Sequence, residues 1–307
     1  MSWTADLPLV GAGGEPVDLW RTLSSHGVAD LPPNKIDEIA RTLEVTLRVP
    51  SGRPRTVRVV QGLAGQAAVT VLGPAPSKAL ANALLGRVGH ILRLDEDLSD
   101  FYERIRADPD LSWAAAGAGR LMRSATVFED VVKTIATTNC AWSATVRMVG
   151  AFVEHLGEPG IGAEAGGSYG RAFPTPAAMA QASEDFYKDV VRAGYRSAYF
   201  RALADAVASG SLDLEELAEA PREELPDDEV AERLLALPGV GPYAAAHIMM
   251  LVGRYSPLIL DSWTRPKYAR VNGRKASDAG IERRFRRYGP YAGLAFWLYL
   301  TRDWVDD

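Results

Sequence analysis

Hydrophobic positions change their spacing once along the chain, near residue 75. Before that point they alternate with polar positions in three short runs, 44–50, 56–60 and 67–73, and this pattern predicts strands. Ser51, Gly52 and Pro54 lie between the first two runs and favour a turn. We therefore expect an antiparallel hairpin or meander at the start of the chain.

After Gly73 the hydrophobic spacing becomes helical and stays so. The pattern predicts helices at about 77–92, 97–107, 127–140, 143–156, 176–191, 196–209, 213–219, 227–236, 242–252, 264–270, 277–287 and 290–303. Thr175 before Pro176 is a typical helix start, and the glycine-rich stretch 157–170 predicts a loop or insertion. The expected fold is mainly α with an N-terminal α+β part: a small antiparallel-sheet domain, 1–100, followed by an all-helical body, 101–307.

Composition removes several classes of protein. With 47% apolar and 24% charged residues, the 307-residue chain has the balance of an ordinary globular protein. The longest nearly uncharged apolar stretches, 243–253 and 291–300, are about half the length of a membrane span. The start of the chain has no secretion signal, so we expect a cytoplasmic protein, associated with the nucleoid if bacterial. The single cysteine, Cys140, excludes intramolecular disulfides and four-cysteine metal sites within the chain.

The net charge of −5 hides a strong asymmetry. Residues 213–232 carry ten acids and one arginine, whereas residues 261–287 carry nine Lys or Arg and three acids. A basic stripe attracts phosphates through its local field even on an acidic protein. It can equally be a solvated helix face, so charge alone suggests a polyanion partner without establishing one.

The most informative stretch is Leu237-Pro238-Gly239-Val240-Gly241-Pro242-Tyr243, between two amphipathic helices. Two glycines around one apolar residue predict a tight turn with unshielded backbone amides, and the second glycine leads into a helix that starts with proline. The amides of Gly239, Val240 and Gly241 could bind a DNA phosphate. The carbonyls of Leu237 and Val240 could hold a monovalent cation. A plain corner between two helices is the alternative interpretation.

This stretch resembles the hairpin of the helix–hairpin–helix DNA glycosylase superfamily, in particular the 3-methyladenine and 8-oxoguanine glycosylase branches. The resemblance extends over roughly residues 40–303. It includes segments 173–176 and 193–196, the helix that leads to Asn139, and the strand-rich start. It also includes Asp261, which lies 18 residues after Tyr243 at a separation that the family uses.

The resemblance implies that Asp261 is the catalytic carboxylate. Removing a base breaks a C–N glycosidic bond through a transition state with oxocarbenium character, and an ionised aspartate would stabilise the positive sugar and orient or deprotonate water. The alternative role for Asp261 is a simple cap of the helix predicted at 264–270.

Position 243 decides the type of reaction that the resemblance implies. Relatives that also cut the strand carry a lysine there, and its amine forms a Schiff base with the sugar. The phenol of Tyr243 cannot form an imine, and Lys267 does not match the lysine position. The expected enzyme is therefore monofunctional: it needs no cofactor, apart from a possible Na⁺ or K⁺ at the hairpin, and leaves an abasic site.

Base pocket and duplex wedge are also expected. Tyr243 and His247 share one helix face, so both could line the base pocket. Further candidates for the pocket wall are Trp142, Tyr195, Trp263 and Trp297. Each of these aromatic residues can also be part of the hydrophobic core, and His247 can be an ordinary buried histidine. By resemblance, Asn139 fills the gap left by an everted base; it can also be a helix cap. Many relatives have a histidine where this chain has Trp263, and that histidine contacts the DNA backbone. Here the contact would pass to Arg265 or Lys267, and we expect these two residues to bind phosphate together with the hairpin amides.

Together these features predict a monomeric, monofunctional DNA glycosylase of base-excision repair that acts on a damaged purine in double-stranded DNA. An alkylated purine is favoured, because a cationic base gains cation–π attraction from aromatic walls. An 8-oxoguanine-type glycosylase and a non-catalytic hairpin DNA-binding protein remain alternatives.

Overall fold

The computed structural model describes residues 3–50, 52–163 and 166–305. An antiparallel sheet of five strands occupies the N-terminal part, in the order β1-β5-β4-β3-β2. Its strands are β1 (Trp3–Pro8), β2 (Lys35–Asp37), β3 (Thr42–Leu47), β4 (Arg55–Gln61) and β5 (Gln66–Val71). The three strands expected from alternation correspond to β3, β4 and β5. The two edge strands, β1 and β2, were missed.

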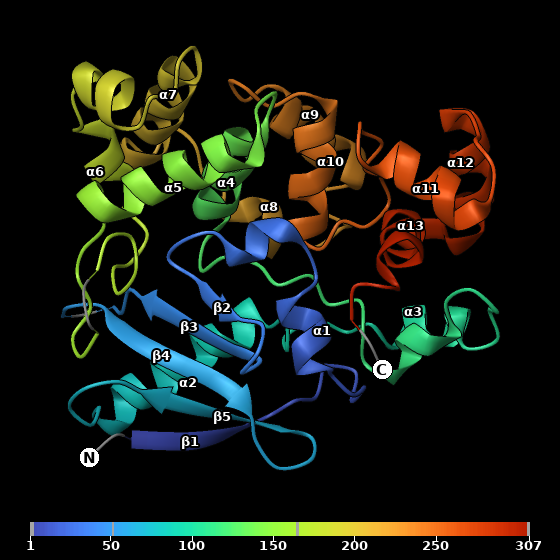
Figure 1. Ribbon diagram of the computed structural model, residues 1–307, viewed down its shortest axis with the longest axis horizontal. Helices are drawn as coiled ribbons and strands as arrows, with labels where there is room; N and C mark the ends of the chain where they lie inside the picture. Colours follow the sequence, from blue (N-terminus) through green and yellow to red (C-terminus); the bar gives the residue numbers. More distant parts are fainter. Residues whose placement is uncertain (1–2, 51, 164–165, 306–307) are drawn as a thin grey trace.

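One face of the sheet is apolar and is covered by α2 (Lys78–Ile91), which lies behind the strands in Figure 1. Val45 faces Val57 and Val57 faces Val71 across the ladder, and all three are buried. Leu84 and Val88 of α2 pack into the same cluster. Period-two alternation therefore provides the sheet with one buried face, as antiparallel sheets typically have.

The remainder of the chain is helical, as expected. After α1 (Leu19–Leu23) in the N-terminal part, the helices of the body are α3 (Ser99–Ile105), α4 (Val127–Thr137), α5 (Trp142–Leu156), α6 (Pro176–Ala180), α7 (Arg196–Ala208), α8 (Glu216–Glu219), α9 (Asp227–Leu235), α10 (Pro242–Leu251), α11 (Thr264–Asn272), α12 (Asp278–Phe285) and α13 (Ala292–Thr301). Among the residues that the structure describes, no helix is long and apolar enough to cross a bilayer.

Two of the expected helices end at least three residues earlier than the hydrophobic pattern predicts. The helix expected at 176–191 stops at Ala180. A π-helical turn, Phe186–Val190, comes next, and the amide of Phe186 at its start donates to Oγ of Ser183 at 3.1 Å. The helix expected at 127–140 stops at Thr137, because the chain turns at Asn139, whose φ is +47°. Asparagine tolerates this left-handed conformation better than most residues.

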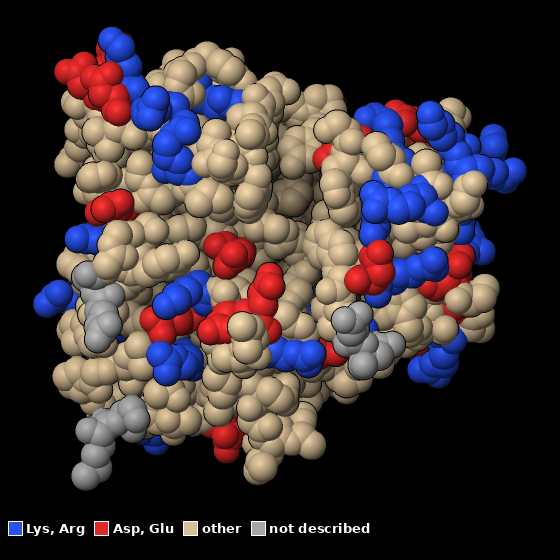
Figure 2. Space-filling model, viewed as in Figure 1, with Lys and Arg blue, Asp and Glu red and all other residues tan. Residues whose placement is uncertain are grey.

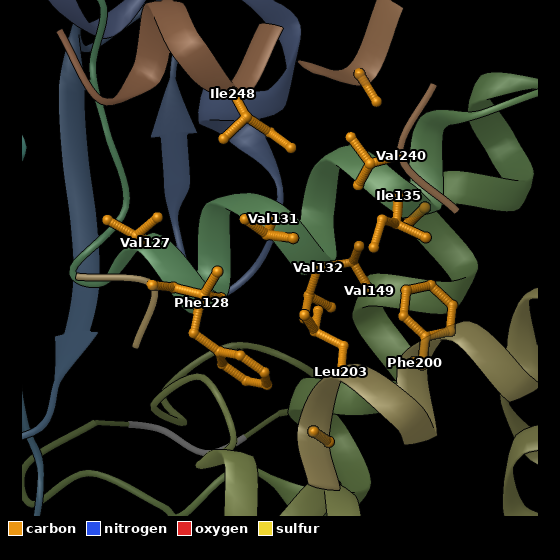
Figure 3. Close-up of a cluster of buried hydrophobic side chains, with 14 of the residues drawn as sticks. Val127, Phe128, Val131, Val132, Ile135, Val149, Phe200, Leu203, Val240 and Ile248 are labelled. Carbon is orange, nitrogen blue, oxygen red and sulfur yellow. The ribbon is translucent and has the colours of Figure 1, made fainter. Parts of the chain in front are cut away.

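Helix α10 is the centre of the helical body and is buried on nearly all sides. Ile248 belongs to a cluster with α4, α5 and α7, part of which Figure 3 shows around Val132, Phe200 and Leu203. Met250 belongs to a second cluster formed with α3 and α11–α13. Tyr243, in the first turn of α10, packs against both clusters, so they hold this turn in place.

The sheet part and the helical body meet at a seam of buried polar contacts. Arg93, which follows α2, is 1% exposed and donates to the carbonyls of Leu121 (2.6 Å) and Met250 (3.0 Å), and also to that of Leu251. Its guanidinium also pairs with Glu96 at 3.0 Å. Arg93 thus caps the last carbonyls of α10 from outside the helical body.

Residues 160–162 of the glycine-rich stretch lie against the sheet, so they belong to the same seam. Ile161 forms a bridge with Arg55 at the start of β4. A Cβ at Gly162 would lie 2.5 Å from the backbone nitrogen of Gly73, so only glycine fits this crossing. The stretch therefore fastens the helical body to the sheet.

Candidate active site

The predicted hairpin is a tight turn between α9 and α10. Gly239 has φ +82°, and a Cβ there would lie 2.6 Å from Cδ2 of Tyr199. The amide of Val240 donates to the carbonyl of Leu237 at 3.1 Å, and the Val240 side chain is buried in the core. Both conformation and space therefore require glycine at position 239.

This hydrogen bond changes what the turn can offer to a ligand. Because the Val240 amide is used within the turn, the expectation that it binds phosphate is not supported. For the amides of Gly239 and Gly241, no hydrogen bond is found in the described part of the chain. The Leu237 carbonyl keeps its second lone pair, so the cation expected at Leu237 and Val240 stays a prediction.

A cavity of about 650 Å³ opens beside the hairpin. Its walls come from the turn and first residues of α10, the end of α4, the start of α7, and the loop before α11. The lining residues are Thr137, Thr138, Asn139, Cys140, Tyr195, Tyr199, Gly239, Gly241, Pro242, Tyr243, Ala244, Leu260, Asp261 and Ser262. Four expected site residues, Asn139, Tyr195, Tyr243 and Asp261, are thus brought together with the two hairpin glycines.

Asp261 accepts amides at the start of α11 and also lines the cavity. Its Oδ1 accepts the amides of Trp263 (2.8 Å) and Thr264 (2.6 Å), while its own amide donates to Oγ1 of Thr264 (2.8 Å). These contacts cap the start of α11 and fix the carboxylate at the cavity wall. No hydrogen bond of Oδ2 is found within the described residues, so one oxygen stays available to a ligand.

Tyr243 lies at the start of α10 and also lines the cavity. Its hydroxyl is 3.4 Å from that of Thr137, and burial raises the pKa of the phenol. The phenol is therefore protonated at neutral pH and can donate or accept a hydrogen bond. It offers no nucleophilic amine.

The opposite wall combines the end of α4 with the start of α7. Arg196 donates to Thr138 through Nε (to Oγ1, 3.3 Å) and through a second guanidinium nitrogen (to the carbonyl). The same guanidinium lies 4.5 Å from the ring centre of Tyr195, which is 57% exposed. These contacts hold Asn139 and Tyr195 together at the rim.

Sequence reasoning missed Thr137, Thr138, Tyr199 and Ser262 as lining residues. Tyr199 had a usable signal, because it lies four residues after Tyr195 on one helix face and their rings are 5.9 Å apart. The threonines had none, since only the fold brings the end of α4 to the hairpin.

His247 does not line this cavity, which corrects the expectation of a pocket residue. It lies behind Tyr243, with ring centres 6.1 Å apart, and faces His26 at 5.7 Å. Burial lowers the pKa of His247 to about 4 and that of His26 to about 3, so both are neutral. Nε2 of His247 has no hydrogen-bond partner among the described residues. His247 is therefore not a fully hydrogen-bonded buried histidine either.

The expected tryptophan walls also lie elsewhere. Trp142 begins α5, is 49% exposed and lies beside Gly27 of the N-terminal part. Trp263 packs against Trp297 and Trp304, with ring centres 5.7 Å from each. The aromatic part of the cavity wall is therefore built from tyrosines.

Two basic residues expected to bind phosphate differ sharply. Lys267 is 7% exposed and its Nζ pairs with both carboxylate oxygens of Asp303 at 2.7 and 2.8 Å, so the expectation for Lys267 is not supported. Arg265 forms an exposed bidentate pair with Asp278 at 2.8 and 2.9 Å. Such an exposed pair is weak and can be exchanged for a phosphate.

Basic side chains flank the cavity on two sides. Figure 2 shows lysine and arginine gathered over α6 and α7 on one side of a hollow and over α11 and α12 on the other, with a largely uncharged surface between. On the α12 side, Arg284 and Arg287 are already paired with Asp110 and Asp108. A polyanion lying across the hollow would meet positive potential at both ends.

No protein-family model and no curated protein matches this chain. Solved structures do match over nearly its whole length. MBOgg1 in complex with a low-affinity DNA ligand gives a TM-score of 0.70 at 18% identity, covering 98% of this chain and 96% of that one. The 3-methyladenine DNA glycosylase from Archaeoglobus fulgidus gives 0.69 at 19% identity, covering 99% and 100%.

The 8-oxoguanine glycosylase/lyase from Clostridium acetobutylicum, in its apo form, gives a TM-score of 0.68 at 20% identity, covering 94% of each chain. At these identities the similarity establishes the fold. The chain thus has the fold of these DNA glycosylases, with an N-terminal sheet followed by a helical body that contains a helix–hairpin–helix, as its sequence predicts.

Proposed function

We propose that this protein is a DNA glycosylase that hydrolyses the N-glycosidic bond of a damaged base in duplex DNA. One observation carries the proposal: the carboxylate of Asp261 is fixed through one oxygen at the wall of a cavity bordered by the glycine turn. The fold that this chain shares with DNA glycosylases supports the proposal, although a fold alone does not determine function.

The geometry suits a dissociative hydrolysis. As the bond to the base breaks, positive charge develops on the sugar, and a fixed carboxylate stabilises that charge without having to reorganise. Oδ1 is held by two amides, so Oδ2 is the oxygen that would face the sugar or a water molecule. The water attacks the sugar carbon, its proton passes to the carboxylate or to solvent, and an abasic site remains.

A monofunctional reaction is favoured by the residues around Asp261. Tyr243 occupies the position where a lysine would be needed to form an imine with the sugar, and the amine of Lys267 is held by Asp303. No lysine is among the residues that line the cavity. We therefore propose no strand-cleavage step.

The cavity has room for an everted nucleotide. Its volume of about 650 Å³ lies within the range of small-molecule pockets. Tyr195, Tyr199 and Tyr243 provide faces for stacking, which would favour a cationic alkylated purine. Asn139, exposed at the rim and held in a left-handed turn, would fill the gap in the duplex.

The test is a base-release assay with duplexes that contain 3-methyladenine, 7-methylguanine, hypoxanthine, uracil or 8-oxoguanine, with borohydride added in parallel. We expect release of an alkylated purine and no trapped covalent adduct. Release of 8-oxoguanine alone would show that the substrate is an oxidised purine and not an alkylated one. A borohydride-trapped adduct would overturn the monofunctional assignment. Tight DNA binding without release of any base would favour the non-catalytic DNA-binding alternative.

A further inference from the structure

The wall of the cavity that carries Asn139 continues outward onto the first two turns of α5. Trp142, Ser143, Val146 and Arg147 are exposed there, and their spacing places them on one side of the helix. Trp142 and Val146 are 49% and 41% exposed. The side of α5 that faces away from these residues is buried in the core through Met148 and Phe152. An apolar and basic strip therefore begins directly beside the rim.

A second arginine joins this strip from the segment before α7. Arg147 donates to the carbonyl of Arg192 at 3.4 Å, so the two residues are neighbours in space. Both are exposed, and neither forms an ion pair with any residue that the structure describes. By contrast, Arg201 on α7 pairs with Glu184 at 3.8 Å. Arg147 and Arg192 are thus cations without a compensating acid.

The strip is tied to the cavity rim by short connections. Arg192 precedes Tyr195 by three residues, and Arg196 links Tyr195 to Thr138. Asp261 and the hairpin line the same cavity from other elements, α10 and the loop before α11. Figure 2 shows the basic surface over α6 and α7 separated from that over α11 and α12 by the hollow.

We propose that this strip, which we call the α5 ridge (Asn139, Trp142, Val146, Arg147 and Arg192), binds the DNA strand opposite the damaged base. The inference rests on the proposed function. If the hairpin amides hold the backbone of the damaged strand, the complementary strand must run across a groove from it, and the minor groove is only about 6 Å wide. The next surface beyond the wedge residue Asn139 is the α5 ridge.

The chemistry of the ridge fits that strand. Two unpaired guanidinium groups suit two phosphates, and the flat face of Trp142 with Val146 suits the apolar edges of sugars and bases. A protein partner is the other occupant that an exposed apolar strip can have. The absence of acids among the ridge residues and its continuity with the cavity rim favour DNA.

The first test compares the double variant Arg147→Gln/Arg192→Gln with a matched control, Arg53→Gln/Arg106→Gln. All four arginines are exposed, and both double variants remove two positive charges; Arg53 lies in the β3–β4 turn and Arg106 just after α3. Affinity for a damaged duplex is measured over a range of salt concentrations. We expect the salt slope to fall by about 1.8 in the ridge variant, since each lost phosphate contact removes about 0.9. The control keeps the wild-type slope.

The second test identifies the strand. A photoreactive benzophenone side chain replaces Trp142, and each strand of the duplex carries a different label. We expect crosslinks to the strand opposite the damaged base. Crosslinks to the damaged strand, or none on a fully bound duplex, would overturn the proposal. An unchanged salt slope in the ridge variant would also do so.

Both tests measure binding, so they remain valid if no base is released. Base release by the control variant Arg53→Gln/Arg106→Gln should stay within about twofold of wild type, because neither arginine lines the cavity. Failure of the glycosylase proposal would instead appear as absent release in the wild-type protein. The two failures are therefore distinguishable.

Discussion

Polar side chains lie around the cavity and also at the seam between the sheet part and the helical body. The two regions differ in how completely these polar groups are paired. In the seam, Arg93 donates to several carbonyls and to Glu96, and Lys133 pairs with Glu129 at 2.7 Å, with both side chains buried. At the cavity, Asp261 keeps one oxygen unpaired, and the hairpin glycines present unused amides. Paired groups hold the two parts of the molecule together, whereas the incompletely paired groups are available to a substrate.

The comparison predicts that substitutions in the two regions separate activity from stability. The largest effect on activity is expected for Asp261→Asn. Loss of the negative charge should slow base release by about 10²–10³-fold, the scale of removing one preorganised electrostatic contact. The amide oxygen of asparagine can still accept from Trp263 and Thr264, so Tm and DNA affinity should stay close to wild type.

Single-turnover kinetics and thermal unfolding measure these two quantities. Asp261→Ala is the useful control, because it removes the charge and also the cap, and should cost a further ~1 kcal/mol of stability. Base release at the wild-type rate in Asp261→Asn would show that the carboxylate does not stabilise the transition state.

Arg93→Met should give the opposite result. It removes the buried donor of the carbonyls at the end of α10 and leaves Glu96 with the hydroxyl of Tyr255 as its remaining buried donor. Removing one partner of a buried pair in this way costs about 3–5 kcal/mol. Denaturant unfolding measures the loss. Base release by the folded fraction at low temperature should be unchanged, because Arg93 lies at the far end of α10 from Tyr243. A fall in base release without a fall in stability would contradict the division between seam and cavity.

A pH series tests the two buried histidines behind Tyr243, His247 and His26. Their pKa values are lowered from 6.5 to about 3 for His26 and about 4 for His247, because burial disfavours the charged ring. Neutral histidine is therefore preferred in the folded state, so this stability is complete above pH 6.5 and is lost as the pH falls toward 4. For His247 the shift corresponds to about 3 kcal/mol.

Asp130 works in the other direction over a similar range. Burial raises its pKa from 3.8 to about 7, so its contribution to stability falls as the pH rises between those values. The variant His247→Phe isolates the histidine contribution, since it keeps a buried ring and removes one titrating group. We expect a shallower loss of unfolding free energy between pH 6.5 and 4. An unchanged pH profile would mean that His247 is charged in the folded protein.

The smallest effects are expected for the two basic residues of α11. Arg265→Gln should lower the salt slope of DNA binding by about 0.9, because the exposed guanidinium can exchange Asp278 for a phosphate. Lys267→Gln should leave that slope unchanged and reduce only stability, since its amine is held by Asp303. Equal slopes in both variants would remove Arg265 from the DNA interface.

Much of the fold follows from the period of the hydrophobic residues. The change from alternation to helical spacing near residue 75 locates β3–β5 and the long helices, because each of these elements buries one face. Strands β1 and β2 escape this reasoning. The burial of β1 alternates only between intermediate and exposed, and β2 has three residues. Edge strands of this kind carry little hydrophobic signal.

The candidate site was predictable where local sequence constrains it. The glycine turn follows from the local sequence, whereas Asp261 was assigned through the family resemblance and its separation from that turn. The structure brings both to one cavity. Trp142 and Trp263 were assigned from residue type, and His247 from its place one helical turn after Tyr243. Neither type nor spacing tells which way a side chain points. The phosphate role expected of Lys267 is not supported for a related reason: the partner of its amine, Asp303, lies 36 residues away in the sequence.

The central claim is that Asp261 stabilises a positive charge on the sugar, and affinity for a cationic sugar mimic tests it most directly. The measurement compares a duplex containing a protonated pyrrolidine in place of one sugar with a duplex containing a neutral tetrahydrofuran at the same position. We predict that wild type binds the cationic duplex at least about 10²-fold more tightly, as for other transition-state analogues, and that Asp261→Asn loses this preference. Equal affinity of wild type for the two duplexes would contradict the account.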